Sequence, residues 1–156
     1  MIFLGLVFAV FVSASPLIHP YSYDSSFSNL EKLQQGSIVR NNNLNSEFYA
    51  KAWIPKEKPV AAVLALHGLG EHISRYEDLF STFKNEKILV LGFDLKGFGQ
   101  TLVQDGNKKP GHLFYGDESF DSLREDIHFF WNGLDHILKD VQADNIPRYL
   151  ASNFTN

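Results

Sequence analysis

The chain has 156 residues, 44% of them apolar, which is enough for one domain of ordinary size with its own hydrophobic core. The formal net charge of −4 at pH 7 and the lack of a dense Lys/Arg cluster exclude a basic nucleic-acid-binding surface, so we expect no nucleic-acid partner. Because the chain contains no cysteine, apolar burial and not disulfide bonding must hold the fold together.

The N-terminal segment has the pattern of a secretory leader. Residues 1–12 are almost entirely apolar but too few to span a bilayer, and the small residues Ser13 and Ala14 follow them. We therefore expect residues 1–14 to be a signal peptide that is cleaved after Ala14, and the protein to be secreted. The segment carries no Lys or Arg, and the alternatives are a buried first strand or an uncleaved anchor.

The next residues predict a loose segment and then a hairpin. Residues 15–36 are rich in Ser, Tyr and Asn, and we expect a flexible lead-in apart from one helical turn near residues 30–33. Two strand-like segments, 37–40 and 47–54, flank the turn-forming cluster Asn41–Asn43, which predicts an antiparallel hairpin. The second arm alternates between apolar and more polar residues, as an edge strand with one wetter face does.

An unbroken apolar run, Val60–Leu66, ends at His67 and Gly68. A run without alternation predicts a strand buried on both faces, as in a parallel sheet. Glycine lets the backbone turn tightly and leaves peptide N–H groups bare at the carboxyl end of the strand, where ligands of open α/β sheets bind. We therefore expect the chemistry at this turn, although an ordinary strand-to-helix connection remains the alternative.

Downstream of this turn, helical and strand patterns alternate. Apolar residues at helical spacing over 76–83, with Ser74 as the cap, predict a helix. The apolar run 88–93 predicts a second buried strand, which ends at Asp94 and leads into a glycine-rich loop over 96–101.

The longest helical pattern runs from Phe120 to Leu138, after a polar, irregular stretch over 102–116. A short apolar run at 149–151 then predicts a further strand. This order predicts an α/β fold with a mostly parallel sheet, an antiparallel N-terminal hairpin and flanking helices. Carboxylates near the start of the long helix are expected to cap it and interact with its dipole: Asp117, Asp121, Glu125 and Asp126.

Three segments in this order and spacing resemble a known family. Residues 52–55 read Ala-Trp-Ile-Pro, residues 67–72 read His-Gly-Leu-Gly-Glu-His with Arg75 and Tyr76 after them, and residues 93–101 read Phe-Asp-Leu-Lys-Gly-Phe-Gly-Gln-Thr. Together they resemble the opening half of the α/β-hydrolases grouped as monoacylglycerol lipases, lysophospholipases and serine aminopeptidase-like hydrolases. The resemblance implies an eight-stranded, mostly parallel sheet, a Ser–Asp–His triad and hydrolysis of a small lipid ester, without a cofactor.

The resemblance also implies roles for residues at the first turn. Such enzymes hold the oxyanion with two backbone N–H groups, one of which comes from the loop after the third strand. By position this donor is the N–H of Leu69. Gly68 and Gly70 would let this amide point into the pocket, and His67 would be a supporting structural group and not the triad base.

The loop after the second buried strand would brace the same pocket through Asp94, Gly97 and Gly99. In two places this loop departs from the family pattern, because many relatives have His where this chain has Phe98, and they often have Arg where it has Lys96. These differences would alter the hydrogen bonding of the loop without deciding the function.

The larger departure lies at the end of the sequence. Residues 146–151 match the strand that leads into Gly-His-Ser-Met-Gly-Gly in the family, but Phe154 stands at the nucleophile position, and no Gly-x-Ser-x-Gly occurs. With the nucleophile, the triad Asp and the triad His absent, we expect residues 37–156 to be a truncated α/β-hydrolase domain that is inactive by itself.

Two alternatives stay open. A non-catalytic secreted protein could bind an acyl chain on half the fold. The family resemblance implies a small lipid ester as the partner, with peripheral lipid contact as a further expectation. A metal site at His67, His72 and His112 is the second alternative. Because the first two lack the one-turn helical spacing of a zinc protease, we expect no metal.

Overall fold

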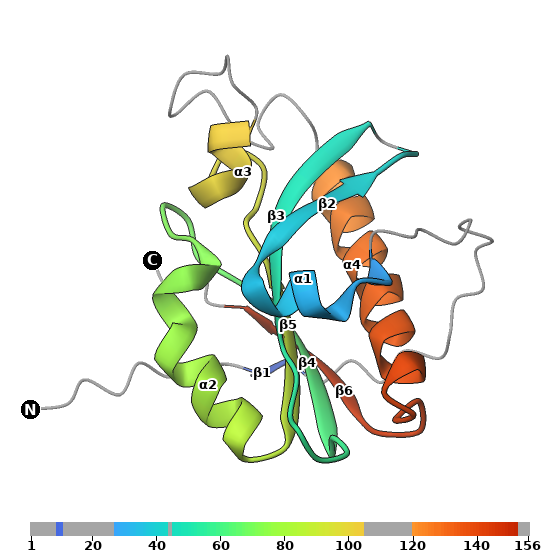
Figure 1. Cartoon of the computed structure of the whole chain (residues 1–156). Coiled ribbons are helices and arrows are strands. Elements are labelled where there is room, and N and C mark those ends of the chain that lie inside the picture. The colour runs from blue at the N-terminus through green and yellow to red at the C-terminus, as the bar shows by residue number, and fades with distance from the viewer. Residues whose placement is uncertain (1–8, 11–26, 44, 105–119, 153–156) are drawn as a thin grey trace, which may run out of the picture.

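The computed structural model describes residues 9–10, 27–43, 45–104 and 120–152. Within them, one mixed sheet has the strand order β1-β6-β4-β5-β3-β2 (Figure 1). The strands are β1 (Ala9–Val10), β2 (Ser37–Asn41), β3 (Ser46–Trp53), β4 (Ala61–Leu66), β5 (Ile88–Phe93) and β6 (Arg148–Ser152). The helices are α1 (Leu30–Gln35), the 3-10 helix η2 (Ile73–Tyr76), α2 (Glu77–Asn85), α3 (Gly99–Gln104) and α4 (Phe120–Asp140).

Strand β4 lies inside the sheet, parallel to β6 on one side and to β5 on the other. Every residue from Ala62 to Leu66 is buried, so the predicted two-sided burial of this strand is confirmed. Leu66 is paired with both Phe93 of β5 and Ser152 of β6. The carboxyl ends of these three parallel strands therefore meet at one edge of the sheet.

Strands β2 and β3 form the predicted antiparallel hairpin, and the N–H of Asn43 donates to Asn41 Oδ1 at 3.1 Å in its turn. The prediction of an edge position for the second arm is wrong. β3 pairs with β5 as well as with β2, so β2 is the edge. Helix α2 supplies a carboxylate for the lysine of β3, since Lys51 Nζ lies 2.8 Å from Glu77 Oε2. Alternating polarity therefore did not mean solvent exposure.

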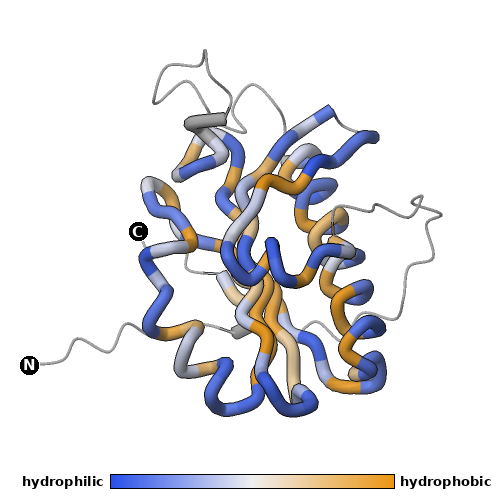
Figure 2. Tube along the Cα trace, viewed as in Figure 1, coloured by the Kyte–Doolittle hydropathy of each residue, from blue (hydrophilic) through white to orange (hydrophobic). Residues whose placement is uncertain are grey.

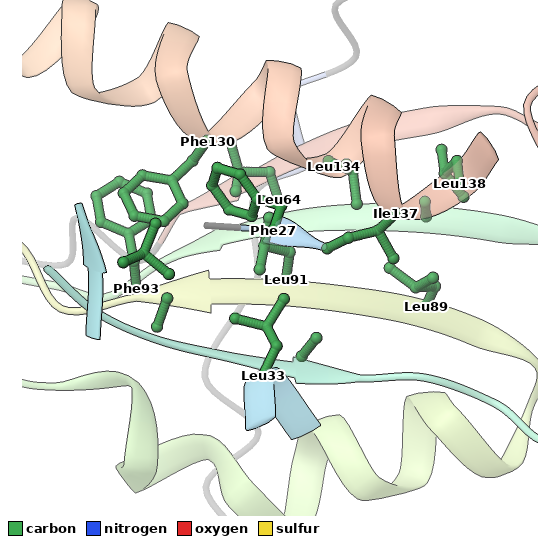
Figure 3. Packing of buried hydrophobic residues seen from close by; sticks show 14 of the residues in the cluster. Phe27, Leu33, Leu64, Leu89, Leu91, Phe93, Phe130, Leu134, Ile137 and Leu138 are labelled. Atoms are coloured by element: carbon green, nitrogen blue, oxygen red, sulfur yellow. The ribbon is translucent and has the colours of Figure 1, made fainter. Parts of the chain in front are cut away.

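Helix α4 covers one face of the sheet, and the predicted long helix is confirmed (Figure 1). Its apolar residues pack against β4 and β5, as Figure 3 shows for Phe130, Leu134 and Ile137. The rings of Phe93 and Phe130 are stacked with centroids 3.8 Å apart. Apolar character is concentrated along the inner strands and this helix (Figure 2), so the larger part of the core lies between them.

Helix α2 and the preceding η2 cover the opposite face through a smaller cluster that includes Ile73, Phe80 and Trp53. Ser74 does not cap α2 as predicted, because it lies inside η2 and α2 begins at Glu77. The extra 3-10 turn carries the chain from the end of β4 to the start of α2. No helix in the described part of the chain has the length and apolar character to cross a membrane.

The folded part begins before residue 37. Phe27 is buried and Leu33 of α1 joins the larger core, and a Cβ on Gly133 of α4 would overlap the Phe27 ring. Phe27 and Leu33 thus attach this segment to the core, and the helical turn predicted near residues 30–33 is present as α1. Of the predicted signal peptide the structure describes only β1, which pairs antiparallel with β6.

Candidate functional site

Two connections share the edge where the parallel strands end. One follows β4 and runs from His67 to His72, and the other follows β5 and runs from Asp94 to Phe98. Because Leu66 is in register with Phe93, both connections leave the sheet at the same level. The two loops in which the sequence predicted the site are therefore adjacent.

His67 joins the two connections and is fully buried. Its Nε2 accepts the backbone N–H of Leu95 at 2.9 Å, so the ring proton must sit on Nδ1, which donates to the carbonyl oxygen of Gly68 at 2.8 Å. Burial lowers the pKa of His67 below its usual value, although the charges of Asp94 and Glu71 oppose this. A neutral ring with both nitrogens occupied acts as a structural link between the loops and not as a proton acceptor.

The carbonyl of Gly68 fixes the direction of the next amide. Gly68 O accepts from His67 Nδ1 and also from the N–H of Glu71, at 3.2 Å. The C=O of Gly68 and the N–H of Leu69 belong to one trans peptide plane and point in opposite directions. With the oxygen held toward the buried imidazole, the N–H of Leu69 must point away from it.

The amides of the turn differ in their partners. The N–H of Gly68 donates to Glu71 Oε2 at 3.2 Å, whereas the N–H of Leu69 has no hydrogen-bond partner among the described residues. The side chain of Leu69 is 64% exposed. Gly70 adopts a φ of +77°, and a Cβ at this position would meet open space, so the position needs glycine for its backbone conformation and not for room.

Asp94 ties the starts of two helices to this edge. Its Oδ1 accepts the N–H of Ile73 at 2.8 Å, and its Oδ2 accepts the N–H of Gln100 at 2.8 Å. The carboxylate is buried, so these bonds replace the water that it loses. A Cβ at position 99 would overlap Asp94 Oδ2 and lie 2.8 Å from His72 Cβ, and Gly99 has a φ of +53°. Only glycine fits beside this carboxylate.

The loop predicted over 96–101 is shorter than expected, because α3 begins at Gly99. Gly97 has a φ of +86° in the remaining turn. Thr101, which the sequence did not single out, is buried in the first turn of α3. Its Oγ1 accepts the N–H of Tyr49 at 2.9 Å and donates to Asp94 O at 2.8 Å, so it links β3 to the loop.

Lys96 fixes the same loop to α4. Its Nζ lies 3.3 Å from Asp126 Oδ2 and donates to Ser122 Oγ at 3.0 Å. Asp126 is fully buried in the second turn of α4, so its prediction as a capping or dipole residue is wrong. No local pattern identifies this pair, since its members lie far apart in the sequence. Asp121 is exposed and pairs with Arg124, 3.2 Å away.

Three of the residues considered from the sequence, Asp117, His112 and Phe154, lie outside the described residues. His72 is the residue before η2 and is half-buried. Among the described residues no group of three or more His, Asp or Glu side chains is arranged to hold a metal ion.

Comparison with known proteins identifies the family of this arrangement. A family model described as "Serine aminopeptidase, S33" matches residues 57–152, which include both connections and β4 to β6. The chain belongs to the serine aminopeptidase family of α/β-hydrolases. The resemblance seen in the sequence and the predicted α/β fold are confirmed.

Relatives and solved structures agree with this assignment. The chain is 40% identical over 85 residues to a putative monoglyceride lipase of Schizosaccharomyces pombe, covering 51% of this chain and 22% of that protein. It is 31% identical over 80 residues to the human monoglyceride lipase, covering 50% of this chain and 26% of that protein. A carboxyl esterase from Bacillus coagulans, solved with glycerol, superposes with a TM-score of 0.58 at 27% identity, covering 74% of this chain and 34% of the esterase.

The match thus spans about a quarter of the length of these lipases, from 22% to 26%. In this serine aminopeptidase-family chain, the matched residues are those that build the two connections and the strands beneath them.

Proposed function

We infer that this chain supplies the oxyanion-binding part of a lipase-like carboxylic ester hydrolase, with the backbone N–H of Leu69 as a donor. The observation that carries this proposal is the orientation of the Gly68–Leu69 peptide plane. Gly68 O is held by His67 and by the amide of Glu71, which leaves the Leu69 N–H directed away from the buried imidazole. A donor that is fixed before substrate binds needs no reorganisation when negative charge develops on a carbonyl oxygen.

The position of β6 supports this role. Ser152 lies in register with Leu66, so the chain leaves β6 at the edge where the Leu69 amide is located. In the G-x-S-x-G hydrolases the nucleophile sits on the turn that follows such a strand. A serine there would attack an ester carbonyl, and the carbonyl oxygen, now negatively charged, would accept the Leu69 N–H.

The substrate class we propose is a monoacylglycerol or a similar small lipid ester. Two of the relatives are named as monoglyceride lipases, and the superposed bacterial structure is a carboxyl esterase. The exposed side chain of Leu69 would offer apolar contact to an acyl chain or to a lipid surface at the mouth of this site.

A chemical probe tests the part played by these 156 residues alone. They contain no Gly-x-Ser-x-Gly, so we expect the purified polypeptide neither to hydrolyse a short-chain ester nor to be labelled by a fluorophosphonate. Covalent labelling of any serine, located by mass spectrometry, would contradict this expectation.

A chimera tests the donor itself. Residues 1–152 are joined to the part of the Schizosaccharomyces pombe protein that follows the corresponding strand, and hydrolysis of a monoacylglycerol is measured. Leu69→Pro removes the N–H and is expected to lower kcat by about 10²–10³-fold, as loss of one oxyanion donor does. Leu69→Ala keeps the N–H and serves as the control. The proposal fails if the proline variant, with an unchanged melting temperature, keeps the kcat of the parent chimera.

The alternative function is that of a non-catalytic acyl-chain-binding protein. It predicts a cooperative thermal transition of the monomer together with saturable binding of a fluorescent fatty acid. A polypeptide that is insoluble, or that melts without cooperativity and binds no fatty acid, would count against it.

We also propose that the protein enters the secretory pathway through residues 1–14. The apolar segment followed by Ser13 and Ala14 supports this. Expression in eukaryotic cells and N-terminal sequencing of the product in the medium tests it, and a mature chain that starts at Ser15 is expected. Retention of Met1 on an intracellular product would contradict it.

A further inference from the structure

We propose that Glu71 is a positioning residue that selects the Leu69 amide, and not the Gly68 amide, as the oxyanion donor. This inference rests on the proposed function and extends it from the donor to the group that orients the donor. Glu71 lies within the same turn, three residues after Gly68, and has no part in the expected catalytic triad.

The first observation is a reciprocal pair of hydrogen bonds that closes the turn. The N–H of Gly68 donates to Glu71 Oε2 at 3.2 Å, and the N–H of Glu71 donates back to Gly68 O at 3.2 Å. Both peptide planes that flank Gly68 are therefore fixed by one residue. The first bond occupies the Gly68 N–H, and the second helps to turn the Leu69 N–H in the opposite direction.

The second observation is that Glu71 itself is held in place. The hydroxyl of Tyr76 donates to the same oxygen, Oε2, and Arg75 Nη1 lies 3.3 Å from Oε1. The hydrogen bond from Tyr76 lowers the pKa of Glu71 below its usual value, so the carboxylate is ionised at neutral pH. Because Arg75 is 60% exposed, its ion pair contributes less than the tyrosine does.

As a result, the two neighbouring amides differ in burial and in hydrogen bonding. Gly68 is buried and its N–H faces a carboxylate, whereas Leu69 is exposed and its N–H has no partner among the residues that the structure describes. Without the Glu71 side chain, the Gly68 N–H would lack its acceptor and the turn would lose one of the bonds that fix it. The Leu69 N–H would then sample more directions, and a donor that is not preorganised stabilises an oxyanion less.

Amide hydrogen exchange on the 156-residue chain tests this without any need for activity. In the unmodified protein we expect the Gly68 amide to be protected and the Leu69 amide to exchange rapidly. Glu71→Ala is expected to raise the exchange rate of Gly68 about tenfold or more, because a charge-assisted hydrogen bond is lost. Glu71→Gln keeps an acceptor oxygen and is expected to raise it less. Glu77→Ala, which changes a glutamate that contacts Lys51 and Trp53, is the control and should leave Gly68 unchanged.

A pH titration keeps the proposal testable if Glu71→Ala does not fold. The amide shift of Gly68 should titrate together with the side-chain carboxyl of Glu71, whose other charged or titratable neighbours are Arg75, Tyr76 and His67. Tyr76→Phe should raise the midpoint of both signals equally. A Gly68 shift that does not follow the Glu71 carboxyl, or Gly68 exchange that is unaffected by Glu71→Ala, overturns the proposal.

The activity of the chimera separates this inference from the function on which it rests. Glu71→Ala is expected to lower kcat, with KM nearly unchanged, by less than Leu69→Pro does. A normal kcat for Leu69→Pro would refute the role of Leu69 as oxyanion donor. The exchange data would then still test whether Glu71 fixes the Gly68 amide. A full effect of Leu69→Pro with no effect of Glu71→Ala on kcat or exchange would refute only the positioning role.

Discussion

At the scale of single residues, the loops at the carboxyl ends of β4 and β5 are held in place by buried polar groups that form hydrogen bonds within these loops. His67 is neutral and bonded through both ring nitrogens, and Asp94 accepts backbone N–H groups from two helix starts. A buried polar group without a partner costs free energy, so each substitution here breaks more than one contact. Gly99 belongs to the same arrangement because its missing side chain leaves room for the Asp94 carboxylate.

Alanine substitutions at two glycines with positive φ distinguish the free-energy cost of backbone strain from that of a steric overlap. Gly70→Ala is expected to lower the free energy of unfolding by about 1–2 kcal/mol, since only the left-handed backbone is strained. Gly99→Ala should cost at least about 2 kcal/mol more, because the added methyl group also displaces the Asp94 carboxylate from the backbone N–H groups that donate to it. Urea unfolding of both variants measures the difference. Equal losses would mean that Asp94 is not displaced.

At the scale of elements, the loop after β5 is held from both sides of the sheet. Asp94 connects it to η2, and Lys96 connects it to α4 through the buried Asp126. The aromatic ring of Phe48 in β3 lies beneath the ammonium group, 5.8 Å from ring centroid to Nζ. The loop is therefore connected to α4 by an ion pair whose carboxylate is fully buried.

The Lys96–Asp126 pair gives a prediction at this scale. Lys96→Met leaves a fully buried carboxylate without its lysine, and we expect a loss of about 3–5 kcal/mol in the free energy of unfolding. The double variant with Asp126→Leu should recover most of this loss, because no charge is then buried. Glu47→Gln, in the exposed pair with Arg40, is the control and should cost at most about 1 kcal/mol. A small effect of Lys96→Met in the same unfolding assay would show that the pair does not anchor the loop.

The elements that the sequence predicted correctly are those that a local pattern specifies. The apolar run of β4 and the apolar face of α4 follow from residue spacing alone, and the end of β4 follows from the glycine after His67. The interior position of β3 could not be predicted, because its polar Lys51 is covered by a carboxylate from α2. The same holds for the candidate site. Residue types indicated the two loops, but the hydrogen bonds that join them connect residues far apart in the sequence and could not be predicted.

At the scale of the whole molecule, the two edges of the described sheet differ. β2 is joined to β3 along its full length, by five register pairs, whereas among the described residues β1 pairs with two of the five residues of β6. An incompletely paired edge offers backbone groups to another strand. The predicted cleavage site lies after β1, so processing would remove the strand that covers β6.

Removal of residues 1–14 is therefore expected to change the association state. A chain that starts at Ser15 should form dimers or larger species with rising protein concentration, because the outer edge of β6 is then unpaired. Light scattering after size-exclusion chromatography measures this, with the chain that retains residues 1–14 as the reference. A shortened chain that stays monomeric at every concentration would show that this edge is blocked in another way.

The hydrogen bonds that orient the Leu69 amide have a consequence for synthesis of the protein. Every partner in that arrangement, from the imidazole of His67 to the carboxylate of Asp94, lies between residues 67 and 100. A ribosome produces this span before α4 and β6 exist, and a domain generally folds as a unit. All the hydrogen-bonding groups of the donor loop are therefore already present in the nascent chain when α4 and β6 are added to complete the domain.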